Sequence, residues 1–109
     1  MTPFQELTQE TWMSQVAEVS EPVLVDFQAP GVGTFIPNET ALQINAIWHK
    51  PVRLVYADVS ELLEIVLFHR IIELPTLCLF YKGQIRKAWT GPNRVEKMLA
   101  AAPELVNIA

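Results

Sequence analysis

The run Val-Leu-Val-Asp-Phe at residues 23–27 constrains the fold more than any other part of the chain. Its apolar side chains are almost uninterrupted, which is typical of a strand covered on both faces. A second run of this type spans residues 52–59. Strands of this kind belong to sheets that carry helices on both sides. The two runs therefore predict an α/β fold with a central sheet.

The segments before, between and after these two runs have apolar residues at the spacing of helices. The first predicted helix spans Thr8 to Val19, with Thr8 as its N-cap. A second begins near Pro37, whose missing N–H is harmless in a first turn. A third begins at Ser60, which is predicted to cap it.

The C-terminal part predicts a hairpin and a last helix. Residues 76–81 and 84–90, joined by the turn Lys82-Gly83, are typical of two antiparallel strands. Asn93 with Glu96 has the spacing of a capping box for the helix that follows. The order is α-β-α-β-α-β-β-α, in one domain over residues 1–109. Strands joined through helices are expected to be parallel, so the sheet is mixed.

Charge and composition exclude several functions. The net charge is -4 and the basic residues are scattered, so we expect no nucleic-acid partner. No apolar run reaches membrane-spanning length and the N-terminus lacks signal-peptide features, so we expect no membrane partner and a cytoplasmic protein. The single cysteine, Cys78, cannot form an internal disulfide or a structural zinc site. We expect no metal and no cofactor.

Three strings in this order resemble the thioredoxin family. "EPVLVDFQAP" is similar to the first central strand of that family, and "IIELPTLCLFYKGQ" to its proline-containing segment. "WTGP" is similar to the glycine segment after its terminal hairpin. The resemblance extends from about residue 8 to residue 102 and implies a thioredoxin-like fold.

The departures from the family lie in the active-site loop. Val32 and Phe35 stand where the family has the two cysteines of its CxxC motif, and Thr34 replaces the proline between them. Neither Val32 nor Phe35 has a thiol, so dithiol–disulfide exchange through this loop is excluded. Cys78, within an apolar run, is expected to be an inert core residue. We therefore predict a protein that is not an enzyme.

Two further positions take their meaning from the resemblance. Asp26 matches the buried acid that moves a proton to or from the second cysteine of the family. That role has no object here, and burial disfavours the charged form of a carboxyl; we expect Asp26→Asn to be neutral or stabilising near neutral pH. Pro75 matches the cis-proline, which is either purely structural or, with Leu74, presents backbone to an extended peptide.

The predicted third helix has more apolar residues than one buried stripe requires. Leu63, Leu67, Phe68 and Ile72 are expected to face outward, near the proline loop. An apolar patch around a former active site is typical of an interaction surface. The alternative is that the N-terminal arm covers this helix or that the helix packs differently.

The leading hypothesis is a redox-inactive binding module for a protein or an unfolded segment, as a chaperone or assembly factor. The alternative is a homodimer formed through the same patch, and the least favoured hypothesis is a monothiol reductase that uses Cys78. The predicted protein-binding residues share the former active-site face: Val32, Thr34, Phe35, Leu63, Leu67, Phe68, Ile72, Leu74, Pro75, Gly91 and Pro92.

Overall fold

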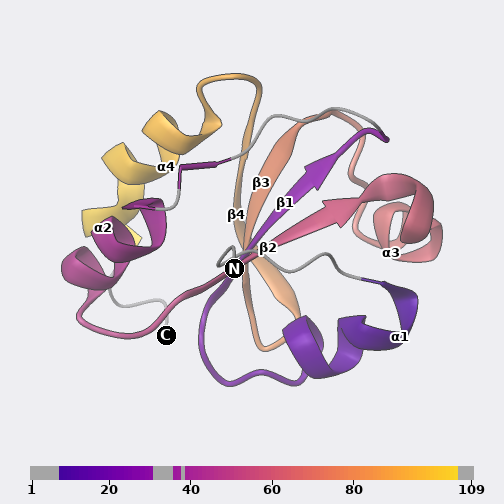
Figure 1. Ribbon diagram of the computed structural model, residues 1–109, viewed down its shortest axis with the longest axis horizontal. Coiled ribbons are helices and arrows are strands. Elements are labelled where there is room, and N and C mark those ends of the chain that lie inside the picture. Colours follow the sequence, from indigo (N-terminus) through magenta and orange to yellow (C-terminus); the bar gives the residue numbers. More distant parts are fainter. Residues whose placement is uncertain (1–7, 31–35, 38, 106–109) are drawn as a thin grey trace.

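The computed structural model describes residues 8–30, 36–37 and 39–105 (Figure 1). Its sheet has the strand order β2-β1-β3-β4. The strands are β1 (Val23–Gln28), β2 (Arg53–Asp58), β3 (Thr76–Tyr81) and β4 (Gln84–Thr90). β1 and β2 are parallel, and the other neighbouring pairs are antiparallel. The mixed sheet is confirmed.

The connection from β2 to β3 differs from the prediction. Both strands flank a helical segment, yet β3 runs antiparallel to β1 and therefore also to β2. The helix α3 (Leu63–Phe68) is short and lies beyond the ends of β1 and β2 (Figure 1). The chain therefore enters β3 from the end at which β2 stopped. A parallel strand would require a crossover that returns along the sheet.

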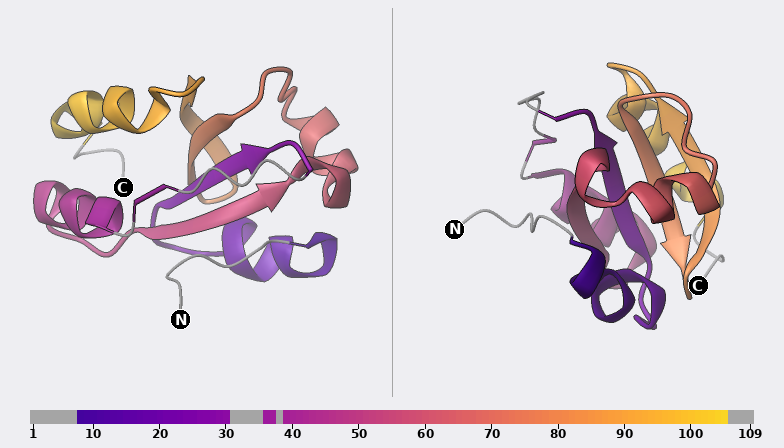
Figure 2. Two further views of the ribbon diagram at one scale, coloured as in Figure 1. Left: turned by 45° about the horizontal axis from the view of Figure 1, so that its top comes forward. Right: turned by 90° about the vertical axis from the view of Figure 1, so that its right-hand side faces the viewer.

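Two apolar cores lie on the two faces of the sheet (Figure 2). One contains Val25 and Phe27 of β1 with Trp12 of the first helix and Leu62 before α3. The other contains Leu24 of β1 with residues of α2 (Glu39–Trp48) and α4 (Arg94–Ala101). Successive side chains of a strand point to opposite faces, which is why one apolar run supplies both cores. Helices on both faces are confirmed.

The first helix begins as predicted, Ser60 is not the predicted cap, and Asn93 takes the N-cap position of α4 without the predicted capping box. Thr8 Oγ1 accepts a hydrogen bond from the Thr11 N–H at 3.3 Å and caps α1 (Gln9–Trp12), which continues as a π-helical turn, Met13–Ala17. Asp58 Oδ1, not Ser60, accepts the capping bond, from the Ser60 N–H at 2.8 Å. It caps the 3₁₀ turn Val59–Glu61, and α3 follows without a side-chain cap. Asn93 makes no capping bond because its backbone (φ -100°, ψ 20°) lacks the extended form that an N-cap adopts.

The hairpin between β3 and β4 turns at Lys82 and Gly83. Both residues have positive φ, 53° and 79°, as in a type I′ turn. A Cβ at Gly83 would also lie 3.2 Å from the carbonyl oxygen of Ala17, which is a tight contact. Both the positive φ and this close approach therefore favour glycine. β4 then forms one edge of the sheet, with Arg86 and Lys87 exposed.

The last helix is tied to α2 by one buried hydrogen bond. α4 gives way to a 3₁₀ turn, Ala102–Leu105, that contains Pro103, so the predicted end of the helix is confirmed. Trp48 Nε1, at the end of α2, donates to the carbonyl oxygen of Ala102 at 2.6 Å. No helix in the described residues is long and apolar enough to cross a membrane.

We expect Trp48→Phe to lower the free energy of unfolding by about 1–3 kcal/mol, because it leaves the buried Ala102 carbonyl without its donor. Urea unfolding followed by circular dichroism measures the change. Trp89→Phe is the control, since the Trp89 indole makes no hydrogen bond with a described residue. Equal losses in the two variants would contradict the assigned role of the bond.

Candidate functional site

A buried ion pair joins the middle of β1 to the start of α4. Asp26 is fully buried on β1 and Arg94, at the first position of α4, is 5% exposed. Arg94 Nε donates to Asp26 Oδ1 at 2.6 Å and Arg94 Nη2 donates to Oδ2 at 2.7 Å. Gln28 Nε2 adds a third bond to Oδ2 at 2.7 Å. The hydrogen bonds to Asp26 raise the pKa of Arg94 above its ordinary value.

This pair changes what we expect of Asp26. The sequence alone predicts that Asp26→Asn is neutral or stabilising, because burial disfavours a charged carboxyl. With Arg94 in place, the same change leaves a buried guanidinium without its counter-charge, which is strongly unfavourable. Sequence reasoning missed Arg94, although one signal was available. A cation in the first turn of a helix opposes the helix dipole, so an arginine there indicates a nearby anion.

The ion pair also holds two loops. Arg94 Nη1 donates to the carbonyl oxygen of Gly91 at 3.2 Å. The Gly91 N–H in turn donates to the carbonyl oxygen of Pro75 at 3.0 Å, and the Leu74–Pro75 bond is cis, as the resemblance implied. One chain of contacts therefore connects β1, the loop before α4 and the loop before β3.

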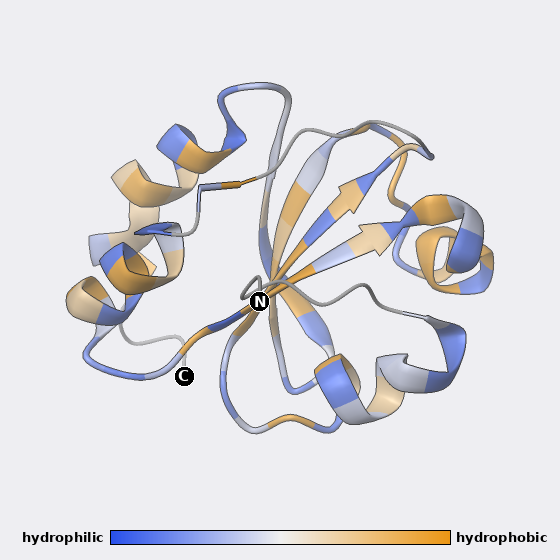
Figure 3. Cartoon of the chain, in the orientation of Figure 1, coloured by the Kyte–Doolittle hydropathy of each residue, from blue (hydrophilic) through white to orange (hydrophobic). Residues whose placement is uncertain are grey.

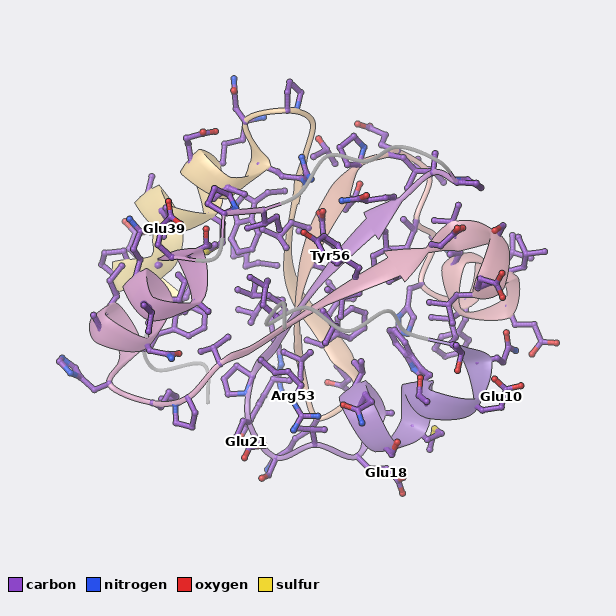
Figure 4. All side chains as sticks on the ribbon, viewed as in Figure 1. Glu10, Glu18, Glu21, Glu39, Arg53 and Tyr56 are labelled. Atoms are coloured by element: carbon purple, nitrogen blue, oxygen red, sulfur yellow. The ribbon has the colours of Figure 1, made fainter. Side chains whose placement is uncertain are left out.

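Tyr56, labelled in Figure 4, lies on β2, the strand next to the one that carries Asp26. It is the register partner of Asp26, and its hydroxyl accepts a hydrogen bond from the Ile36 N–H at 3.0 Å. Burial raises the pKa of this hydroxyl above its usual 10.0. Ile36 directly follows residues 31–35, so the predicted site residues Val32, Thr34 and Phe35 lie outside the described residues.

The apolar surplus of the third helix is exposed, as the sequence predicted. The exposed fractions are 60% for Leu63, 76% for Leu67, 81% for Phe68, 87% for Ile72 and 40% for Leu74. We call these five side chains the α3 surface. Leu63, Leu67 and Phe68 lie on the mostly hydrophobic helix α3 at one end of the sheet (Figure 3), and Ile72 and Leu74 lie in the loop that follows it. No part of the chain that the structure describes covers them.

The segment from α3 to Leu74 contacts the core through some side chains and leaves the Leu74 backbone without a hydrogen bond to a described residue. The partly buried residues Ile65, Val66 and Ile71 pack against the Trp12 core. The backbone N–H and C=O of Leu74 make no hydrogen bond with a described residue. Of the other two predicted site residues, Pro92 is exposed and Gly91 is half-buried.

The side chains that act as nucleophiles, bases or metal ligands in other proteins are buried or isolated in this one. Cys78 is fully buried on β3, and burial, with a contribution from the charge of Asp26, raises the pKa of its thiol from 9.0 to about 12. The His69 ring lies 5.2 Å from the Phe80 ring, and burial lowers its pKa. Within the described ranges no group of His, Cys, Asp and Glu could hold a metal ion.

We expect Asp26→Asn and Arg94→Met each to lower the free energy of unfolding by about 3 kcal/mol, because each leaves one buried charge uncompensated. The double variant Asp26→Leu/Arg94→Met removes both charges and is expected to lose less than either single variant. Urea unfolding at neutral pH measures all three. A midpoint for Asp26→Asn at or above that of the wild type would restore the original expectation.

We expect the Cys78 thiol to resist labelling by dithiobisnitrobenzoate in the native protein near pH 9 and to react at once in denaturing urea. The raised folded pKa has a second consequence. Its contribution to stability is complete below the unfolded value near 9.0 and is lost as the pH rises toward 12. A Cys78→Ala variant should show a shallower loss of stability over that range. Rapid native labelling would contradict the buried placement.

Comparison with known proteins agrees with this architecture. The thioredoxin family model matches residues 3–104. A solved structure of a Malassezia sympodialis thioredoxin (Mala s 13) is 21% identical, with 94% of this chain and 90% of that chain covered and a TM-score of 0.67. That likeness concerns the fold. A search of curated proteins finds no match. The family match extends over nearly the whole chain, and the protein therefore belongs to the thioredoxin family.

Proposed function

We propose that this protein binds other polypeptides through the α3 surface and the Leu74–Pro75 loop, and that it does so without disulfide exchange. It would act as a chaperone or assembly factor rather than as an oxidoreductase.

The observation that carries the proposal is the exposure of five large apolar side chains within residues 63–74. Their removal from water in a complex is favourable at roughly 25 cal/mol per Å² of apolar surface. Exposed patches of this kind on a small domain indicate a binding surface more often than chance exposure. The patch belongs to one end of the sheet, beside the loops that the Arg94 contacts hold.

The backbone of Leu74 supports an extended ligand. Its N–H and C=O have no partner among the described residues, so an extended segment can pair with them as an added strand would. The Gly91 contact fixes the adjacent Pro75 carbonyl. A preformed edge of this type lowers the ordering cost of binding.

The lack of an accessible thiol supports a role without electron transfer. The chain has one cysteine, and its two positions that match the family's reactive cysteines are Val32 and Phe35. Cys78 is buried and its thiolate is disfavoured at neutral pH, so it is a poor nucleophile for a substrate disulfide.

The test uses a short peptide with a core of alternating valine and leucine, flanked by glycine and serine and labelled with an uncharged dye. We expect the wild type to bind it in fluorescence anisotropy and Leu67→Asp to weaken binding by about tenfold or more, because a charge replaces an apolar contact. Leu42→Asp is the matched control: Leu42 is 71% exposed on α2, far from α3 (Figure 1).

A second assay separates binding from redox activity. We expect no acceleration of insulin reduction by dithiothreitol when the protein is added. The proposal fails if the peptide does not bind, or if Leu67→Asp and Leu42→Asp bind equally. It also fails if the wild type accelerates insulin reduction and Cys78→Ala does not.

A further inference from the structure

Exposed carboxylates alternate along the chain with the residues of the α3 surface. Glu61, Glu64 and Glu73 are all exposed and all belong to the segment that carries the five apolar side chains. Arg70 is the one lysine or arginine in residues 58–74. The apolar patch therefore has a rim with an excess of negative charge.

Contacts within the described residues leave this charge uncompensated. Glu64 Oε2 accepts a hydrogen bond from Gln9 Nε2 at 2.9 Å, and a neutral amide cancels no charge. Asp58, at the start of the segment, likewise accepts from the N–H and hydroxyl of Ser60. Among the described residues the Asp26–Arg94 pair is the one salt bridge, so none of the rim carboxylates is paired with a cation.

Several cations outside this segment interact with other groups. Lys82 and Arg86 lie over the ring of Tyr81, on the hairpin. Lys97 donates to the carbonyl oxygen of Thr90 and Arg53 to the side chain of Gln15. With Arg70 as the one lysine or arginine of the segment, the rim keeps an excess of negative charge that a basic ligand could balance.

A second copy of this chain is a poor partner for the same reason. A symmetric dimer places one surface against itself, so the rim of Glu61, Glu64 and Glu73 would meet an identical rim. Like charges opposed across an interface are unfavourable. A segment with lysine or arginine on either side of an apolar core would instead satisfy both features of the surface.

We propose that the α3 surface selects polypeptide segments in which basic residues flank an apolar core. This inference rests on the proposed binding function and adds a specificity to it. Glu61, Glu64 and Glu73 are the specificity-determining residues, and the five apolar side chains supply the contact common to all ligands.

The experiment compares three peptides that share the valine–leucine core described above and differ in their flanks: lysine, glycine–serine, or glutamate. We expect the lysine-flanked peptide to bind about tenfold or more tightly than the glutamate-flanked one at low ionic strength. The difference should shrink as salt rises from about 0.01 M to about 1 M, because the screening length falls from about 30 Å to about 3 Å.

Two variants of equal net charge locate the effect. Glu61→Gln/Glu64→Gln/Glu73→Gln should bring the affinities for the lysine and glutamate peptides to within about twofold of each other. Glu18→Gln/Glu21→Gln/Glu104→Gln removes the same charge from exposed positions outside the rim; Glu18 and Glu21 lie near the turn that follows α1, away from α3 (Figure 4). This control should retain the full preference.

The outcomes separate the two proposals. Equal binding of all three peptides, or equal loss of preference in both triple variants, overturns the specificity and leaves the binding function standing. Binding of none of the peptides overturns the binding function itself. Sedimentation that shows a wild-type dimer abolished by Leu67→Asp would assign the surface to a second copy and overturn the specificity.

Discussion

The ion pair between Asp26 and Arg94 connects the middle of the sheet to the loops that border the α3 surface. Two charges removed from water carry a large desolvation penalty, which only close geometry and additional hydrogen bonds offset. Here the guanidinium is bound at two nitrogens and Gln28 adds a third donor. Because this geometry fixes the start of α4 relative to β1, it also fixes Gly91 and, through it, the Pro75 carbonyl. The position of the loops therefore depends on a contact beneath them.

β1, β2 and β3 were predictable from the sequence because strands that are largely buried appear as short apolar runs. The mostly exposed β4 was predictable from the hairpin turn at Lys82 and Gly83, and β3 and β4 have the predicted bounds. The exposure of Leu67, Phe68 and Ile72 was predictable as well, since one helix stripe cannot bury so many apolar side chains. The caps at Ser60 and Asn93 failed because capping depends on local backbone angles that residue type does not determine. The direction of β3 failed because the place where a short helix packs is a property of the whole fold.

The Asp26–Arg94 pair was not predicted because its two members are far apart along the chain. Each is unfavourable by itself: a carboxylate in an apolar strand is desolvated, and an arginine at the start of a helix opposes the helix dipole. Two such anomalies of opposite charge in one small domain are best explained together. In the thioredoxin family the acid matching Asp26 serves a cysteine; in this chain an arginine occupies it. The fold of the family is retained, but the buried acid Asp26 pairs with Arg94 in place of a cysteine.

The basic edge strand β4 has a consequence for the protein in concentrated solution. An open strand edge can recruit the edge of another molecule and start an ordered aggregate. Arg86 and Lys87 are exposed on β4, so two such edges brought together would repel each other. A molecule that displays a hydrophobic surface at one end of its sheet is thus protected against stacking at this edge. The charged edge strand β4 disfavours aggregation, while the α3 surface at one end of the sheet remains available for binding.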